Sequence, residues 1–252
     1  MNTPQDSAPS KVPQVTLVFW VIKIAATTLG ETGGDAVSMS MHLGYLAASG
    51  IFLITFALAV WAQVHATRFH AYLYWFAIIA STTVGTTLAD FTTRSLGVGY
   101  SGGSAILLVM LATSFWCWHR RFGNLSVASI RSPGPESFYW LTIMFSQTLG
   151  TALGDWVADT AGLGYTGGML IFGSLLAIAA MLYFWTRLSH TLLFWFAFIV
   201  TRPLGAVLGD FLDKPLASGG LALDRYAASL LLLTFIVACI TLFPQRAAER
   251  AH

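Results

Sequence analysis

The hydrophobic positions of the chain gather into runs of about twenty residues, each long enough to cross a bilayer as an α-helix. Shorter segments rich in polar residues or glycine separate these runs. The eight runs cover residues 15–37, 44–64, 71–92, 101–119, 137–158, 166–186, 191–212 and 226–243. The pattern therefore predicts an all-α membrane protein with eight transmembrane helices, arranged as four helical hairpins.

A frame of tryptophan, glycine and aspartate recurs in every odd-numbered run. The glycine follows the tryptophan by ten residues, and the aspartate follows the glycine by five. The four copies are Trp20/Gly30/Asp35, Trp75/Gly85/Asp90, Trp140/Gly150/Asp155 and Trp195/Gly205/Asp210. Internal repetition of this kind indicates a repeat architecture. We expect four two-helix repeats around a pseudo-symmetric centre, with the odd-numbered helices inside and the even-numbered helices outside.

Composition supports a location in the membrane. Hydrophobic residues make up 56% of the chain and charged residues only 10%, whereas soluble domains carry about 25% charged residues. The tryptophans are spaced by 55, 65 and 55 residues, and the polar segment 120–136 accounts for the longer middle step. The predicted parts are an N-terminal tail 1–14, a first membrane half 15–119, a linker 120–136, a second membrane half 137–243 and a C-terminal tail 244–252.

The basic residues indicate the orientation. Eight of them flank one side of the predicted membrane: Lys11, Arg68, Arg120, Arg121, Arg131, Arg187, Arg246 and Arg250. Only Arg94, Lys214 and Arg225 flank the other side. The positive-inside rule then predicts cytoplasmic termini and four repeats of parallel orientation. The repeat tryptophans would lie near the cytoplasmic interface, where aromatic residues commonly act as membrane anchors. Residues 1–11 lack the pattern of a cleavable signal peptide.

Polar residues recur four, eight and twelve positions before each aspartate. This spacing places them on one flank of a helix, in a stripe about 12 Å long. In repeat order they are Lys23, Thr27 and Glu31; Thr82 and Thr86; Gln147 and Thr151; and Arg202. Pairs of small residues at a spacing of four, such as Gly30 and Gly34, favour close helix packing. Because unsatisfied polar groups cost several kcal/mol in lipid, we expect the stripes to face one another.

Five intramembrane carboxylates form the candidate cation or metal site: Glu31, Asp35, Asp90, Asp155 and Asp210. The neutral oxygen ligands would come from Thr27, Thr82, Thr86, Gln147 and Thr151, with Lys23 and Arg202 as internal counter-ions. Such hard oxygen ligands suit Mg²⁺, Ca²⁺, Mn²⁺ or protons. The stripe contains neither cysteine nor histidine, which argues against a dedicated Cu(I) or Zn²⁺ site. No resident cofactor is expected.

The four repeats differ in charge. Glu31 occurs only in repeat one, and Arg202-Pro203 only in repeat four, where the proline should kink or break the helix. Asp90 and Asp155 have no cation on their own stripes, so we expect them to stay available to a substrate. Further charged residues near the outer ends are expected to be solvated or paired; they are Arg94, Asp159, Asp213 and Lys214.

The repeated motif, with Gly-Asp or Ala-Asp at its end, resembles a family of bacterial polytopic membrane proteins built from four tandem two-helix repeats of unknown function. The resemblance extends from about Val18 to Phe243. It implies a multi-pass protein of the bacterial cytoplasmic (inner) membrane. A second similarity links Glu31-Thr-Gly-Gly-Asp35 to the Glu-x-Gly-Asp signature of exchangers that move manganese or calcium against protons. The spacing here is one residue longer and the motif is not duplicated.

These features lead to a hypothesis and two alternatives. The first is a secondary transporter, in particular an exporter, that moves a hard divalent cation such as manganese against protons through the carboxylate cluster. The alternatives are a cation channel with an acidic ring and a non-transporting membrane sensor or scaffold. The expected partners are the lipid bilayer and a small inorganic cation. The sequence contains no nucleic-acid-binding module, nucleophile–base pair or phosphate cradle, so we do not expect an enzyme.

Overall fold

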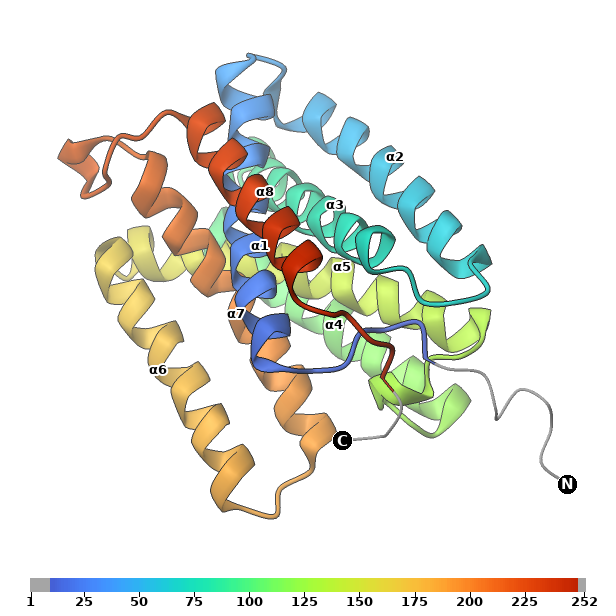
Figure 1. Cartoon of the computed structure of the whole chain (residues 1–252). Helices are drawn as coiled ribbons and strands as arrows, with labels where there is room; N and C mark the ends of the chain where they lie inside the picture. The colour runs from blue at the N-terminus through green and yellow to red at the C-terminus, as the bar shows by residue number, and fades with distance from the viewer. Residues whose placement is uncertain (1–9, 249–252) are drawn as a thin grey trace, which may run out of the picture.

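The computed structural model describes residues 10–248, and eight α-helices account for most of this range (Figure 1). They are α1 (Leu17–Asp35), α2 (Gly44–His65), α3 (Ala71–Asp90), α4 (Gly99–Phe122), α5 (Pro133–Asp155), α6 (Gly164–Trp185), α7 (His190–Asp213) and α8 (Arg225–Leu242). Each predicted hydrophobic run coincides with one helix to within four residues at either end. The all-α prediction is thus confirmed. Residues 1–9 and 249–252 of the predicted tails, including Arg250, lie outside the described residues.

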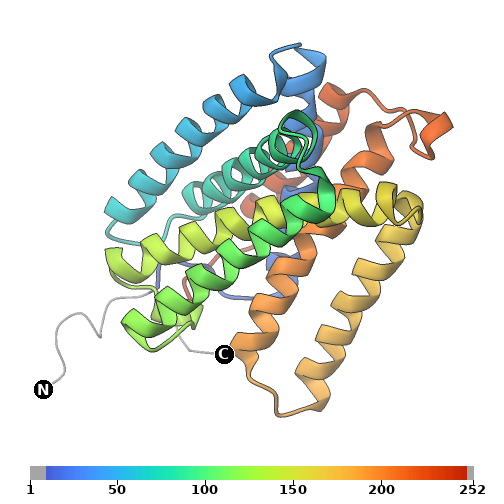
Figure 2. The same ribbon diagram turned by 180° about the vertical axis from the view of Figure 1, so that it is seen from behind.

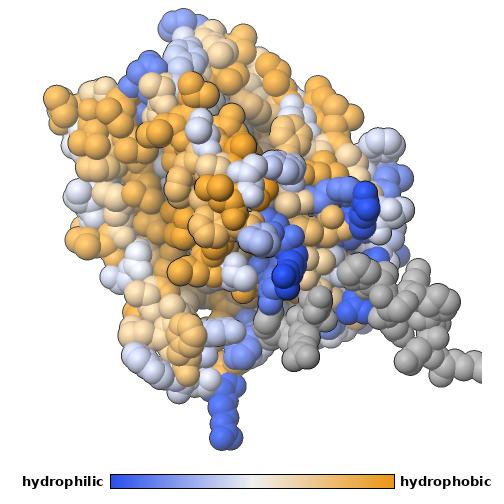
Figure 3. Space-filling model, in the orientation of Figure 1, coloured by the Kyte–Doolittle hydropathy of each residue, from blue (hydrophilic) through white to orange (hydrophobic). Residues whose placement is uncertain are grey.

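Five of the eight described helices are long and apolar enough to cross a membrane: α2, α4, α6, α7 and α8. The other three are less apolar for a reason visible in their sequences. Helix α1 contains Lys23, Glu31 and Asp35, α3 contains four threonines, and α5 contains three threonines and three glycines. On the face shown in Figure 3, hydrophobic residues cover most of the middle and hydrophilic residues gather mainly toward the ends. These features are those of a membrane protein.

The odd-numbered helices form the interior of the molecule. Helix α1 packs against α3, α3 against α5, α5 against α7, and α7 again against α1, which closes a ring of four. The even-numbered helices lie outside this ring (Figures 1 and 2). Each one packs mainly on the odd helix of the following repeat, so that α2 lies on α3, α4 on α5, α6 on α7 and α8 on α1. Neighbouring repeats are therefore interlocked around the ring.

Glycines permit the close approach of the inner helices. The repeated glycine of each odd helix faces the residue that lies eight positions before the aspartate on the next odd helix. The facing pairs are Gly30 with Thr82, Gly85 with Gln147, Gly150 with Arg202, and Gly205 with Thr27. A Cβ added at Gly85 would lie only 2.9 Å from the backbone carbonyl carbon of Gln147. Any side chain at these positions would force the helices apart.

Local sequence determines where the helices begin and end. The Thr16 hydroxyl caps α1 by accepting a hydrogen bond from the Phe19 amide (3.3 Å), and the Asp224 carboxylate caps α8 in the same way. In the first three repeats the aspartate is followed by one π-helical turn: η2 (Ala36–Ser40), η3 (Phe91–Ser95) and η5 (Trp156–Thr160). The first residue of α2, α4 and α6 is then a glycine with a positive φ: Gly44, Gly99 and Gly164. These tight hairpins fix the depth of the aspartates relative to the outer ends.

The two described chain ends meet at the same end of the bundle. Gln14 donates its amide hydrogen to the Arg246 carbonyl (2.8 Å), and Pro13 pairs with Ala247. The Lys11 ammonium is buried and lies 3.0 Å from the Glu136 carboxylate. Burial outweighs this ion pair and raises the pKa of Glu136 above its ordinary value. The N-terminal segment thus covers the end of the bundle at which the odd helices begin.

Candidate functional site

Aromatic side chains fill the axis of the helix ring at the end where the odd helices begin. Trp75, Trp140 and Trp195 are buried, and Trp20 is partly buried. An aromatic residue precedes each tryptophan in the sequence. Two of these preceding residues, Tyr74 and Tyr139, form a hydrogen bond between their hydroxyls across the bundle (2.6 Å). The prediction of lipid-facing anchors is therefore wrong for Trp75, Trp140 and Trp195. The sequence signal for this aromatic plug was the repeated aromatic doublet: Phe19-Trp20, Tyr74-Trp75, Tyr139-Trp140 and Phe194-Trp195.

Lys23 is the first charged residue beyond the plug. Its side chain is fully buried, and its ammonium lies 4.1 Å from the centre of the Phe198 ring. The nitrogen has no hydrogen-bond partner among the described residues. Lys23 was expected to neutralise a carboxylate, but the group that it contacts is an aromatic ring.

The next layer contains Thr27, Thr82 and Gln147. Both threonine hydroxyls donate to backbone carbonyls, including one across a helix interface: Thr27 to the Thr201 oxygen and Thr82 to the Ala26 oxygen, each at 3.2 Å. These bonds hold α1 to α7 and α3 to α1. The Gln147 amide is fully buried, and neither its nitrogen nor its oxygen has a hydrogen-bond partner within residues 10–248. Of the three, Gln147 is the one with free ligand atoms.

Arg202 crosses the centre of the ring. Its guanidinium extends from α7 and donates to the Glu31 carboxylate on α1 (3.0 Å), to the Thr86 hydroxyl on α3 (2.6 Å) and to the Thr151 hydroxyl on α5. One buried side chain therefore connects all four inner helices. Arg202 was predicted to be an internal counter-ion, and the carboxylate with which it pairs is that of Glu31. Helix α7 continues through Pro203 to Asp213, so the predicted break is absent.

The four repeat aspartates lie one turn farther along the axis, and each is paired with a cation from the outer end. Lys214 lies 2.5 Å from Asp35 and 3.0 Å from Asp210. Arg94 lies 3.0 Å from Asp90 and 3.3 Å from Asp155. Asp90 and Asp155 were expected to stay available to a substrate because no cation lies on their own stripes, but both are paired with Arg94. Arg94 and Lys214 each follow the aspartate of their own repeat by four residues, so the spacing indicates these two pairs. The pairs that join two helices, Arg94 with Asp155 and Lys214 with Asp35, cannot be seen in the stripe of one helix.

Three carboxylates converge closely enough to hold one cation. Oxygens of Glu31, Asp35 and Asp210, from α1 and α7, lie within 4.8 Å of one another, and all three side chains are buried. One oxygen of Asp35 has no hydrogen-bond partner among the described residues. The five predicted carboxylates thus divide into a three-carboxylate cluster and an Asp90–Asp155 pair on Arg94. Lys214 contacts two members of the cluster, and sequence reasoning had not assigned it to the site.

Further basic and aromatic side chains lie beside the carboxylates, at the end of the bundle where the odd helices end. Arg225 donates to Asp213 at 2.5 Å and approaches Asp35 to 3.7 Å. Arg94 also donates to the hydroxyls of Tyr45 and Tyr100. These groups separate the buried carboxylates from the outer face.

Carboxylates outnumber cations in this region. Six carboxylates make ion pairs there: Glu31, Asp35, Asp90, Asp155, Asp210 and Asp213. The cations paired with them are four: Arg94, Arg202, Lys214 and Arg225. Fully ionised, the site carries a surplus of two negative charges, since Lys23 contacts none of these carboxylates. One divalent cation or two protons would balance that surplus.

Comparison with known proteins agrees with the repeat structure. No curated protein and no solved structure matches the chain significantly. The sequence model of one family, described as Repeat of Unknown Function (DUF347), matches four consecutive segments, residues 18–69, 73–123, 138–189 and 193–246. Each segment contains one odd helix and the even helix that follows it. The chain therefore belongs to the DUF347 repeat family, with four copies of the repeat.

Proposed function

We propose that all eight α-helices cross the bilayer, as four parallel repeats with pseudo-four-fold symmetry. The cyclic packing of the odd helices supports this arrangement, because it shields the polar residues of α1, α3 and α5 from lipid. Helix α1, with 19 residues, is about 28 Å long, close to the hydrocarbon thickness of about 30 Å. The excess of basic residues at the aromatic end favours a cytoplasmic location for that end and for both termini, in a bacterial inner membrane.

We propose further that the protein is a secondary transporter, an exporter, of a hard divalent cation such as Mn²⁺. The observation that carries this proposal is the convergence of Glu31, Asp35 and Asp210 inside the helix ring. Carboxylate oxygens are the preferred ligands of such ions. Ionisable groups buried within membrane helices commonly mark ion pathways.

Proton coupling follows from the charges. The surplus of two negative charges can be balanced by one divalent cation or by two protons, but not by both together. Cation binding would then release protons from the same carboxylates. This competition is the basis of an antiport mechanism in which a cation leaves as protons enter.

Lys214 has a specific role in this proposal. Its ammonium contacts Asp35 and Asp210, two of the three carboxylates that would bind the cation. Lys214 is partly exposed and lies near the outer end of α7, so it can withdraw toward the outer face. We assign it as a tethered cation that occupies the carboxylate oxygens between transport events. When the substrate binds, its ammonium moves off Asp35 and Asp210, but its charge stays at this end of the site, so that the charge balance is kept.

The axial packing favours a carrier over a channel. The aromatic plug fills one end of the ring, and the Arg202 bridge crosses its middle. An ion path through both would require side chains or helices to move during each transport event. A channel with an acidic ring would have a continuous polar path.

The test is calorimetric binding of Mg²⁺, Ca²⁺, Mn²⁺ and Zn²⁺ to the purified protein at pH 7.5 and pH 5.5. We expect Mn²⁺ to bind at pH 7.5, with weaker binding at pH 5.5 and with proton release. Asp210→Asn should abolish binding, whereas Asp159→Asn, which alters an exposed carboxylate at the outer end, should leave it unchanged. Absence of binding in the folded wild-type protein would favour the sensor or scaffold alternative.

A further inference from the structure

The repeat tryptophans differ in what covers them. Phe56 of α2 packs beside Trp140, with ring centres 6.3 Å apart. Phe115 and Trp118 of α4 pack beside Trp195, at 4.9 Å and 5.7 Å. Side chains of the outer helices thus fill the grooves beside these two tryptophans.

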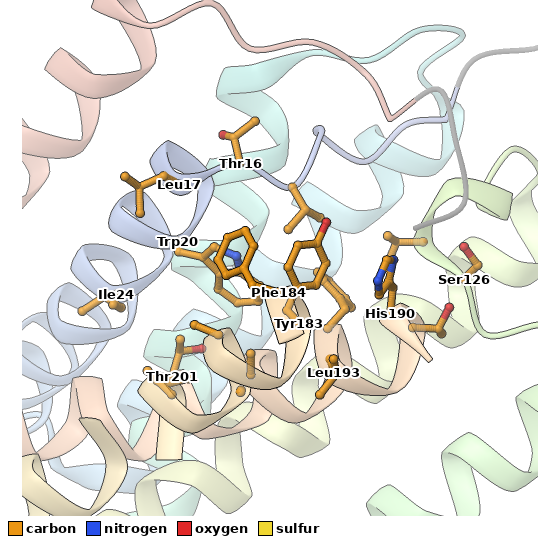
Figure 4. A pocket seen from close by; sticks show the side chains of 18 residues that line it. Thr16, Leu17, Trp20, Ile24, Ser126, Tyr183, Phe184, His190, Leu193 and Thr201 are labelled. Atoms are coloured by element: carbon orange, nitrogen blue, oxygen red, sulfur yellow. The ribbon is translucent and has the colours of Figure 1, made fainter. Parts of the chain in front are cut away.

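The groove beside Trp20 is open. A cavity of about 380 Å³ lies there between α1, α6 and α7, and Trp20 is the one repeat tryptophan that lines it (Figure 4). This volume lies within the range of about 300–1,000 Å³ that is usual for small-molecule sites. The cavity is therefore a local departure from the repeat pattern.

A single position distinguishes the groove beside Trp195 from the groove beside Trp20. Ala180 of α6 and Phe115 of α4 both lie sixteen residues after the first glycine of their helices, Gly164 and Gly99. Phe115 fills its groove against Trp195, whereas Ala180 lines the cavity. The smaller side chain leaves the groove beside Trp20 unfilled.

The cavity lining is amphipathic along its length. Aromatic and aliphatic side chains form most of the wall, and in Figure 4 His190 and Ser126 lie at one end while Ile24 and Thr201 lie at the other. Arg187 follows the end of α6 and precedes the lining residue His190 by three positions. The polar end is also the end of the bundle at which the two ends of the described chain meet.

We propose that this cavity binds one acyl chain of an anionic phospholipid, with the head group near His190 and Arg187. The apolar wall suits an alkyl chain, and basic side chains at the membrane surface suit a phosphate. Exposed apolar side chains at the rim, such as Leu17 and Phe184, place the opening where lipid tails would surround it. This inference rests only on the membrane location proposed above and not on cation transport.

The experiment is native mass spectrometry of the purified full chain in mild detergent with added palmitoyl-oleoyl phosphatidylglycerol. We expect one tightly retained lipid on the wild-type protein. Ala180→Phe, which introduces the side chain that fills the equivalent groove, should reduce its retention at least fivefold. Ala177→Phe, on the same helix but outside the cavity lining, is the matched control and should retain the lipid.

Two further variants keep the proposal testable if Ala180→Phe does not fold. Phe115→Ala should open a second groove, beside Trp195, and add a second retained lipid. Arg187→Gln should weaken retention of phosphatidylglycerol relative to phosphatidylcholine. Equal retention by wild type and Ala180→Phe, or no retention by wild type, would overturn the assignment. The readout needs no divalent cation, so its failure is distinguishable from failure of the transport proposal.

Discussion

At the scale of single residues, Arg202 organises the polar centre. Its guanidinium joins Glu31, Thr86 and Thr151, which come from the three other inner helices. The sequence places these polar side chains on inward-facing stripes because a spacing of four residues keeps them on one flank of a helix. It cannot pair them across helices, and it therefore missed the contacts of Lys214 with Asp35 and of Arg94 with Asp155. The pairs Asp90–Arg94 and Asp210–Lys214 have the same spacing of four residues and could have been predicted from the sequence.

The Arg202–Glu31 pair allows a double-mutant test. Arg202→Met should destabilise the protein by about 3–5 kcal/mol, because it leaves a buried carboxylate without its cation. Adding Glu31→Gln should recover part of this loss, since the second substitution removes the uncompensated charge. Unfolding in detergent, followed by circular dichroism, measures both effects.

Arg121→Met alters an exposed arginine and serves as the control in that series. Its stability should equal that of the wild type. Glu31→Gln alone completes the cycle: if it changed the stability of the wild type and of Arg202→Met by the same amount, Arg202 and Glu31 would not be energetically coupled.

Lys214 gives a prediction about affinity. Lys214→Gln should strengthen Mn²⁺ binding roughly tenfold, or about 1.4 kcal/mol, because the competing ammonium is removed from Asp35 and Asp210. Arg94→Gln should leave the affinity unchanged, since Arg94 pairs with Asp90 and Asp155 instead. Calorimetric titration distinguishes the two variants. Weaker binding in Lys214→Gln would mean that the lysine supports the site and does not compete for it.

At the scale of helices, the repeat is interlocked with its neighbours. The sequence predicted eight helices and their order because the hydrophobic runs and the Trp–Gly–Asp frame are local patterns. It did not predict that each even helix would pack on the next repeat, since that choice depends on the ring closing between α7 and α1. The facing contact of Gly205 with Thr27, which joins α7 to α1, is the physical basis of this closure.

Two alanine substitutions test the packing of the inner helices. Gly85→Ala should destabilise the protein by about 1–3 kcal/mol, because the added methyl group would overlap Gln147. Gly173→Ala, on the outer helix α6, meets no atom within 4 Å and should be neutral or stabilising by up to about 1 kcal/mol. Thermal unfolding of both variants in the same detergent gives the comparison. Similar losses in both would argue against tight packing in the inner ring.

At the scale of the whole molecule, the four repeats share one backbone arrangement but differ in some of the side chains that they carry. The aromatic plug and the aspartates recur in all four repeats, whereas Glu31, Arg202 and the open groove beside Trp20 each occur once. Repetition could be predicted from the sequence because the spacing is regular. The single occurrence of Glu31 and of Arg202 could also be read from the sequence. Their pairing and the open groove depend on contacts between repeats, and these contacts determine which carboxylates converge.

The membrane arrangement predicts which loops are accessible from each side. The native cysteines, Cys117 and Cys239, are free and would first be replaced by serine. Arg68→Cys and Arg187→Cys should then react with a membrane-impermeant maleimide only from the cytoplasmic side. Leu163→Cys and Ser218→Cys should react only from the opposite side. Labelling of all four positions from one side would contradict eight crossings.

The most direct test of the transport proposal is a proteoliposome assay that follows Mn²⁺ and internal pH together. An imposed proton gradient should drive Mn²⁺ movement in the opposite direction through the wild-type protein. Asp35→Asn should abolish both fluxes, and Asp159→Asn should preserve them. Absence of Mn²⁺ flux through the folded wild-type protein, or flux that is indifferent to Asp35→Asn, would contradict the account.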